Sequence, residues 1–345
     1  MMAVFLIVGG ICLKREERRP VIGVTMWDGD GELYDSVAMY ADQLKEILDV
    51  DLQILSLYKT GLNSYIEIVR EFCKNGGDVL INVETEDLYE IMKICEMNGV
   101  YLLQMWEMSD DTDILYRLYG NPYFLGYIVS DEEAAGQKMA EQIRSAGCLN
   151  NVVMTFQQGN VKNMVHHLRK EEFCKGLEPL VPVSVLEISR FDEGIKYLAK
   201  LNIEIDGLLL SRFIVEYSLD TIKSIIGNPE MKFTYFDTNE HTREELEDGD
   251  LVMVSCGQQN VFILAVTYAD AFIENQKEST KKLEITCPYL NITSTEEYDL
   301  YQKNCLQQMP YSAENINILK ESLKNDTNLL EEYAESYSIE WLNTQ

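Results

Sequence analysis

The chain has 345 residues, 46% of them hydrophobic, which is enough for two lobes with separate cores and ordinary for a globular protein. Aspartate and glutamate number 58 against 29 lysines and arginines, so the formal net charge at pH 7 is −29. A surface of this sign repels phosphate backbones and anionic membranes, and nucleic acid is therefore not an expected partner. Taken alone, the acidic excess indicates solubility before it indicates a functional acidic patch.

The N-terminal segment is apolar from Ala3 to Cys12 and then turns basic from Lys14 to Arg19. Its apolar run is too short to cross a bilayer, which needs about twenty residues, but it fits the hydrophobic region of an export signal. No basic residue precedes the run, and the sequence ending at Cys12 matches the lipoprotein box only loosely. We interpret residues 1–19 as a degraded or truncated export signal or lipoprotein segment; a buried first strand is the alternative.

From Pro20 onward, short runs rich in strand-forming residues alternate with helical patterns. The expected elements of the first half are the strand Val21–Met26, the helix Glu32–Leu48, the strand Leu52–Leu57, the helix Ser64–Asn75, the strand Val79–Val83, the helix Asp87–Asn98 and the strands Val100–Trp106 and Phe124–Val129. Such βαβ repetition is typical of a parallel sheet that is covered on both faces.

The segment from Phe124 to Ala140 marks the passage into a second lobe. A strand that ends at Val129 is followed by Ser130-Asp131, which is a helix N-cap signal. Gly136 and Ala140, one turn apart, leave a face on which a helix can lie close to a sheet. The chain is therefore expected to leave one α/β lobe here and to enter another.

The alternation restarts after Asp131. The expected elements of the second half are the helix Glu132–Ala146, the strand Asn151–Phe156, the helix Val161–Leu177, the strand Val183–Ile188, the helix Asp192–Leu201, the strand Gly207–Leu210, the helix Ile214–Ile226, and the strands Lys232–Phe236 and Leu251–Ser255. The helix Val261–Glu274 then returns to the first lobe, and Tyr289–Thr293 is a late strand that crosses a third time.

These elements predict an α/β protein of two Rossmann-like lobes with parallel sheets, joined by a three-strand hinge. The N-terminal lobe comprises residues 20–129 plus 257–289, and the C-terminal lobe residues 130–256 plus 290–311. Residues 312–345 form a helical extension that we expect to pack against the outside of a lobe, because its heptad pattern is not sustained.

The sequence contains no spacing of residues that is typical of a metal site or of a catalytic site. The eight cysteines are scattered without a C-x-x-C pair, which gives no zinc site, and Cys73 and Cys95 lie on apolar helix faces as expected core thiols. No serine or cysteine stands in a nucleophile-elbow context, and no phosphate-binding glycine loop follows the first strand. We therefore expect neither an enzyme nor a cofactor.

Five segments, in order and with the right spacing, resemble those of type I periplasmic sugar-binding proteins, whose two-lobed fold also occurs in the effector domains of lactose-repressor-type regulators. They are the first strand with its loop, the crossover 124–140, Leu168–Phe173, Ile205–Leu210 and Phe233–Asp237. Together they cover most of the chain from residue 21 to about 293. The resemblance implies a clamshell that closes on a small polar ligand.

Two site residues follow from this resemblance. Arg169 occupies the position of an arginine that forks onto sugar hydroxyls, and a planar guanidinium suits either paired hydroxyls or a carboxylate. The alternative is a helix-surface arginine paired with Glu171 or Glu172. Asp237 ends a strand where the family places an aspartate that accepts hydrogen bonds from the sugar; the alternative is an aspartate that initiates a turn.

Elsewhere the chain departs from the family pattern. Arg212 replaces part of an Asn-Asp pair, the expected glutamine is displaced to Gln258 or Gln259, and Trp27-Asp28 replaces an asparagine-rich turn. The complete set of expected ligand-binding residues is Trp27, Asp28, Trp106, Glu107, Arg169, Arg212, Asp237 and Gln258. The set combines aromatic faces with charged donors and acceptors, as clefts for polar ligands do.

The resemblance implies an extracytoplasmic, monomeric solute-binding protein, at the cell surface or in the periplasm, that delivers a sugar or related polyol to an ABC permease. A module that reports ligand to a membrane kinase or chemoreceptor is the alternative, and the sequence does not separate the two. A cytoplasmic repressor would need a DNA-binding domain of about sixty residues before the first strand, where about twenty precede Val21.

Overall fold

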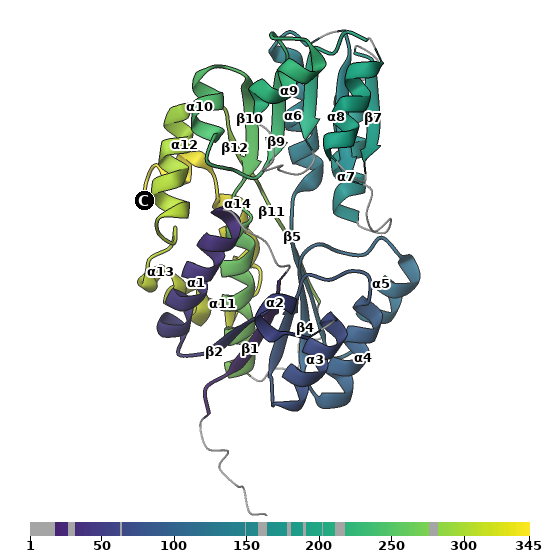
Figure 1. Ribbon diagram of the computed structural model, residues 1–345. Helices are drawn as coiled ribbons and strands as arrows, with labels where there is room; N and C mark the ends of the chain where they lie inside the picture. The colour runs from purple at the N-terminus through teal and green to yellow at the C-terminus, as the bar shows by residue number, and fades with distance from the viewer. Residues whose placement is uncertain are drawn as a thin grey trace, which may run out of the picture.

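The computed structural model describes residues 18–26, 32–62, 64–148, 150–157, 164–177, 181–188, 191–201, 203–210, 218–275 and 282–345. These residues form two α/β lobes, one above the other in Figure 1, each built on a six-stranded sheet. The predicted fold class is confirmed.

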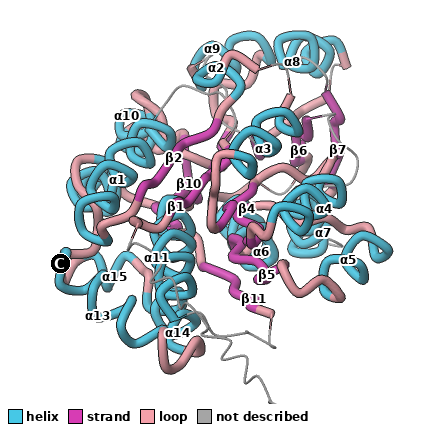
Figure 2. Tube along the Cα trace, turned by 90° about the horizontal axis from the view of Figure 1, so that it is seen from below, coloured by secondary structure: helices cyan, strands magenta, loops and turns pink. Residues whose placement is uncertain are grey.

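The first sheet has the strand order β11-β5-β4-β3-β1-β2, and all its strands are parallel. Its strands are β1 (Val21–Thr25), β2 (Asp51–Leu55), β3 (Val79–Asn82), β4 (Tyr101–Trp106), β5 (Phe124–Ser130) and β11 (Leu283–Cys287). Its helices are α1 (Glu32–Leu48), α2 (Leu57–Thr60), α3 (Tyr65–Lys74), α4 (Leu88–Asn98), α5 (Thr112–Tyr119) and α11 (Gln259–Asn275). Helices α1 and α11 cover one face of the sheet, and α3, α4 and α5 cover the other (Figure 2).

The second sheet repeats this plan with the order β12-β10-β9-β8-β6-β7. Its strands are β6 (Val152–Gln157), β7 (Val183–Ile188), β8 (Gly207–Leu210), β9 (Lys232–Phe236), β10 (Leu251–Cys256) and β12 (Leu290–Ile292). Its helices are α6 (Glu132–Ser145), α7 (Met164–Leu177), α8 (Phe191–Lys200), α9 (Leu219–Ile226), α10 (Thr242–Glu247) and α12 (Thr295–Tyr301), followed by the π-helical turn Gln302–Leu306. In both sheets the carboxyl ends of the parallel strands face the hinge, which is where doubly wound sheets bind ligands.

In the described part of the chain, the backbone passes between the two sheets three times, after β5, after β10 and after β11. The third passage corrects the expectation of wholly parallel sheets, because β12 runs antiparallel to β10. A strand that enters the second sheet from the hinge must run away from it, whereas β10 runs toward it. The single expected strand Tyr289–Thr293 is thus the second half of a crossing that begins with β11.

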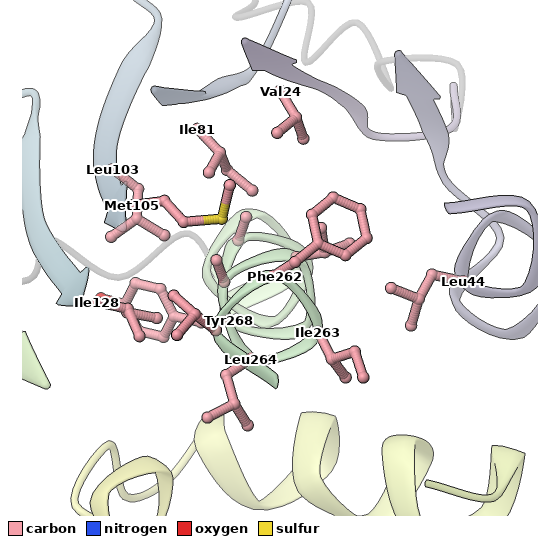
Figure 3. Close-up of a cluster of buried hydrophobic side chains, with 14 of the residues drawn as sticks. Val24, Leu44, Ile81, Leu103, Met105, Ile128, Phe262, Ile263, Leu264 and Tyr268 are labelled. Carbon is pink, nitrogen blue, oxygen red and sulfur yellow. The ribbon is translucent and has the colours of Figure 1, made fainter. Parts of the chain in front are cut away.

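Helix α11 is the centre of the first lobe. Every residue from Gln259 to Ala271 is buried, and a mostly apolar helix that is covered on all sides belongs in a core. Figure 3 shows Phe262 and Tyr268 among side chains from the strands, with Leu264 on the side of the C-terminal helices. The return of the chain to the first lobe therefore completes its core.

The C-terminal segment consists of α13 (Ala313–Leu323), α14 (Leu329–Ser336) and α15 (Ile339–Leu342). Its apolar residues join both cores: Ile316 and Leu330 belong to the core around α11, whereas Tyr337 and Leu342 belong to the core of the second lobe. The sequence correctly predicted helices without an independent coiled coil. It placed them on the outside of one lobe, but they contact both, because their apolar residues fall into two groups.

Several short elements were not predicted. Helices α2, α5 and α10 have at most eight residues, and Ser56 and Leu57, expected at the end of a strand, lead into α2. Cys73 and Cys95 are buried, and their thiols hydrogen-bond to each other between α3 and α4, which confirms the prediction of core thiols.

A buried ion network fastens α13 to α11. Nζ of Lys320 lies 2.6 Å from Oδ2 of Asp270 and 2.8 Å from Oε1 of Glu274, and Asp270 is fully buried. Burial raises the pKa of Asp270 to about 6, although the neighbouring Lys320 acts in the opposite direction. The ionised carboxylate is therefore held at a net cost, and this cost depends on pH.

We expect Asp270→Asn to change how stability depends on pH. The pKa of the folded-state carboxyl exceeds that of the unfolded chain, so folding takes up a proton between about pH 4 and 6. The stabilisation that this proton uptake gives to the folded state is fully present below pH 4 and is lost as the pH rises through 6. The unfolding free energy of the wild type, relative to that of the variant, should fall by roughly 2–3 kcal/mol between pH 4 and 7. Urea titrations across this range measure it, and a difference that does not vary with pH contradicts the assignment.

Candidate functional site at the hinge

Two strand ends, one in each lobe, combine an expected ligand residue with an unusual backbone. Trp106 ends β4 and Asp237 follows β9, and these strands hold the same place in the two sheet orders. Both residues have positive φ, 64° and 63° respectively. This conformation is uncommon for side chains other than glycine and costs about 1–3 kcal/mol, and residues held in it cluster at functional sites.

A buried polar network holds the turn at Trp106. The amide of Glu107 donates to the carbonyl of Met105 at 2.7 Å, which makes Trp106 the central residue of a γ-turn of the rare positive-φ type. The side chain of Gln104 accepts a hydrogen bond from Asn82 and donates to the carbonyl of Glu107 at 2.9 Å. The turn is thus held by a side chain of β4, which is itself bound by the last residue of the neighbouring strand β3.

The three passages of the hinge meet at the hydroxyl of Tyr289. This hydroxyl donates to Oε1 of Glu132 at 2.5 Å and accepts from Nε2 of Gln258 at 2.5 Å. Glu132, Gln258 and Tyr289 follow β5, β10 and β11, so each comes from a different passage. Arg169 of α7 donates to the same hydroxyl at 3.2 Å. We call these four residues the hinge cluster.

Arg169 is buried in an ion pair. Its Nε donates to Oε2 of Glu132 at 2.6 Å, and its guanidinium lies over the ring of Phe236, 3.3 Å from the centroid. Burial lowers the pKa of Arg169, but the carboxylate of Glu132, with Tyr289 and Asp237, raises it by more. Arg169 therefore stays charged, and Asp237 is close enough to act on it. Burial likewise raises the pKa of Tyr289, which keeps the phenol protonated as a donor.

Close packing of α6 on α7 brings this pair together. Asp131 caps α6, since its carboxylate accepts from the amide of Ala134, and this places Glu132 in the first turn. A Cβ on Gly136 would lie 2.6 Å from the carbonyl oxygen of Arg169, so only glycine fits. The predicted N-cap is confirmed. The close neighbour of the Gly136 face is a helix, however, and not the sheet that the sequence suggested.

A second contact joins the lobes beside Asp237. Glu32, at the start of α1, hydrogen-bonds with Thr238 and Tyr298 of the second lobe. Burial raises the pKa of Glu32, and its Oε2 has no hydrogen-bond partner among the described residues. Trp106 is tied to the second hinge passage, since its Nε1 donates to the carbonyl of Gln258 at 3.0 Å.

The structure brings together four of the expected ligand residues. Trp106 contacts Gln258, Gln258 and Arg169 share Tyr289, and Asp237 acts on Arg169. Glu107 follows Trp106 and is half-buried. Trp27, Asp28 and Arg212 lie outside the described residues.

The expected alternatives for Arg169 did not include its actual partner. Glu172 binds Gln137 and Lys175, and it is Glu132 that pairs with Arg169. Glu132 and Tyr289 were not expected in the site. An acid in the first turn of a helix is ordinarily explained by the helix dipole, so only the packing of α7 reveals the buried partner.

Two findings bear on other kinds of function. No group of three or more potential metal ligands occurs within the described ranges. No helix in those ranges is long and apolar enough to cross a membrane.

No protein-family model and no curated protein matches the sequence. Among solved structures, the chain is similar to a carbohydrate transporter from Acidothermus cellulolyticus in complex with myo-inositol (TM-score 0.65, 15% identity, covering 84% of this chain and 99% of the other). It is also similar to an ABC transporter periplasmic solute-binding protein from Actinobacillus succinogenes with bound D-allose (0.63, 14%, 82% and 100%). A putative LacI transcriptional regulator from Bacteroides fragilis is comparably similar (0.63, 10%, 82% and 100%). The chain thus has the type I periplasmic binding protein fold.

The buried pair should contribute strongly to stability. Glu132→Ala leaves the guanidinium of Arg169 desolvated without its partner, so the unfolding free energy should fall by about 3–5 kcal/mol. Lys138→Ala is the matched control, because it breaks a half-exposed pair with Glu141 on the same helix. It should change the unfolding free energy by less than about 1 kcal/mol. Chemical denaturation of both variants measures this, and equal losses would refute the structural role of the pair.

Proposed function

We propose that this protein is an extracytoplasmic solute-binding protein that captures a small polar ligand, a sugar or related polyol, for an ABC importer. The observation that carries the proposal is the convergence of the three hinge passages on Tyr289, next to Arg169 and Asp237. Polar groups are thereby concentrated where the carboxyl ends of both sheets meet. The ligands named for two solved structures of this fold, myo-inositol and D-allose, support the choice of ligand class.

In this proposal the ligand is bound between the lobes by the eight residues expected from the sequence. Trp106 supplies an aromatic face, and Asp237 supplies an acceptor for hydroxyl groups. Both are presented by backbone that is already held in a rare conformation. Fixed donors and acceptors bind more tightly because less conformational freedom is lost on binding.

The remaining features follow from the same role. The lobe comprising residues 20–129 and 257–289 and the lobe comprising 130–256 and 290–311 close on the ligand about the hinge, and the closed monomer docks on the permease. Export depends on residues 1–19, with lipid attachment at Cys12 as one means of anchoring. Binding without chemistry is proposed, since the hinge cluster presents hydrogen-bonding groups and no activated nucleophile.

Asp237→Ala should weaken sugar binding. Loss of this acceptor leaves ligand hydroxyls unpaired, so affinity should fall at least tenfold, about 1.4 kcal/mol. Calorimetry against myo-inositol, D-allose, D-arabinose and other sugars measures this.

The chain offers a matched control in Asp49→Ala. Asp49 also has positive φ, 55°, but it is exposed and lies just before the amino end of β2, away from the hinge. Its replacement should leave affinity unchanged. If a sugar binds the wild type in the micromolar range and both variants bind it equally well, Asp237 has no role as a ligand residue.

A further inference from the structure

The pairing of Arg169 bears on the charge of a ligand bound beside it. A guanidinium binds either paired hydroxyls or a carboxylate, and in a site where its charge is unpaired the carboxylate is the stronger partner. In this structure the side chain of Arg169 is 5% exposed and that of Glu132 is 1% exposed, and the two atoms that join them lie 2.6 Å apart. The positive charge is therefore matched inside the protein.

A ligand carboxylate would have to compete with Glu132 for this guanidinium. Displacement of Glu132 would leave a buried carboxylate without its cation, which is strongly unfavourable. Glu132 is held in place from a second side as well, because Oε1 accepts a hydrogen bond from Tyr289. Both contacts therefore oppose the separation of Glu132 from Arg169.

A second carboxylate acts on Arg169, and a third lies near that second one. Asp237 is close enough to raise the pKa of Arg169, and Glu32 hydrogen-bonds with Thr238, the residue after Asp237. Like charges repel strongly where water is excluded.

We propose that Glu132 is a specificity-determining residue that restricts the site to uncharged polyhydroxylated ligands by keeping Arg169 in an internal ion pair. The inference rests on the proposed function, because it assigns the ligand class of that same site. A ligand hydroxyl group can bind in such a site although no cation is free to pair with it. It donates to carboxylates and accepts from N–H groups.

The experiment compares matched neutral and acidic ligands by calorimetry at pH 7. The probes are D-glucose with D-glucuronate, D-galactose with D-galacturonate, and D-arabinose with D-arabinonate. Wild type should bind the neutral member of a pair at least tenfold more tightly than the acid. Glu132→Gln keeps one oxygen that can accept from Arg169, places an NH2 group opposite Tyr289 and removes the charge, so this ratio should shrink at least tenfold. Glu133→Gln is the control, because the same substitution falls on the exposed neighbour in the same helical turn, and the ratio should not change.

The outcomes separate the two proposals. Tighter binding of the acids by the wild type overturns this inference and leaves the proposed function standing, and this result does not depend on any variant folding. A folded Glu132→Gln protein with the wild-type ratio also overturns it. Failure of the wild type to bind these probes, myo-inositol or D-allose overturns the proposed function and the inference together.

Discussion

The arrangement of the two lobes depends on one hydroxyl group and the ion pair beside it. Tyr289 contacts Glu132 and Gln258, so one atom fixes the three hinge passages relative to one another. Arg169 ties the same point to α7 in the second lobe. Glu132, Arg169 and Tyr289 are buried and Gln258 is half-buried, and a buried polar network is stabilising only when its members are satisfied. The identity of each residue is therefore constrained by the other three.

The repeated sheet plan explains how such a point arises. Each lobe presents the carboxyl ends of its parallel strands to the hinge, and equivalent strands β4 and β9 end in Trp106 and Asp237 with the same rare backbone conformation. The surroundings enforce this conformation differently in the two lobes. The side chain of Gln104, in the same strand, holds the turn at Trp106, whereas the amide of Asp237 donates to the carbonyl of Ser255 in the neighbouring strand β10. The two lobes therefore share a topology but differ in the hydrogen bonds at the carboxyl ends of their strands.

Much of the fold could be predicted from the sequence because its determinants are local. Buried parallel strands are continuous apolar runs, and Ser130-Asp131 marks a helix start wherever it occurs. The site was predictable only in part. The positions of Arg169 and Asp237 follow from motif spacing, but the partner of Arg169 depends on the close approach of α6 and α7 at Gly136, which no local pattern encodes. Tyr289 was likewise read as the start of a strand, because its role requires three distant segments to meet.

The C-terminal segment places a further constraint on motion between the lobes. Trp341 packs against both cores. Its ring is tilted against those of Tyr311 and Tyr337, whose centroids lie 5.0 and 5.8 Å from its own. Tyr311 belongs to the first core and Tyr337 to the second. In a clamshell of three passages alone, a few backbone dihedrals absorb the opening. Here, opening must also keep or break an aromatic contact that spans both lobes. A change in the angle between the lobes would therefore act on the contacts of Trp341 as well as on those of the hinge cluster.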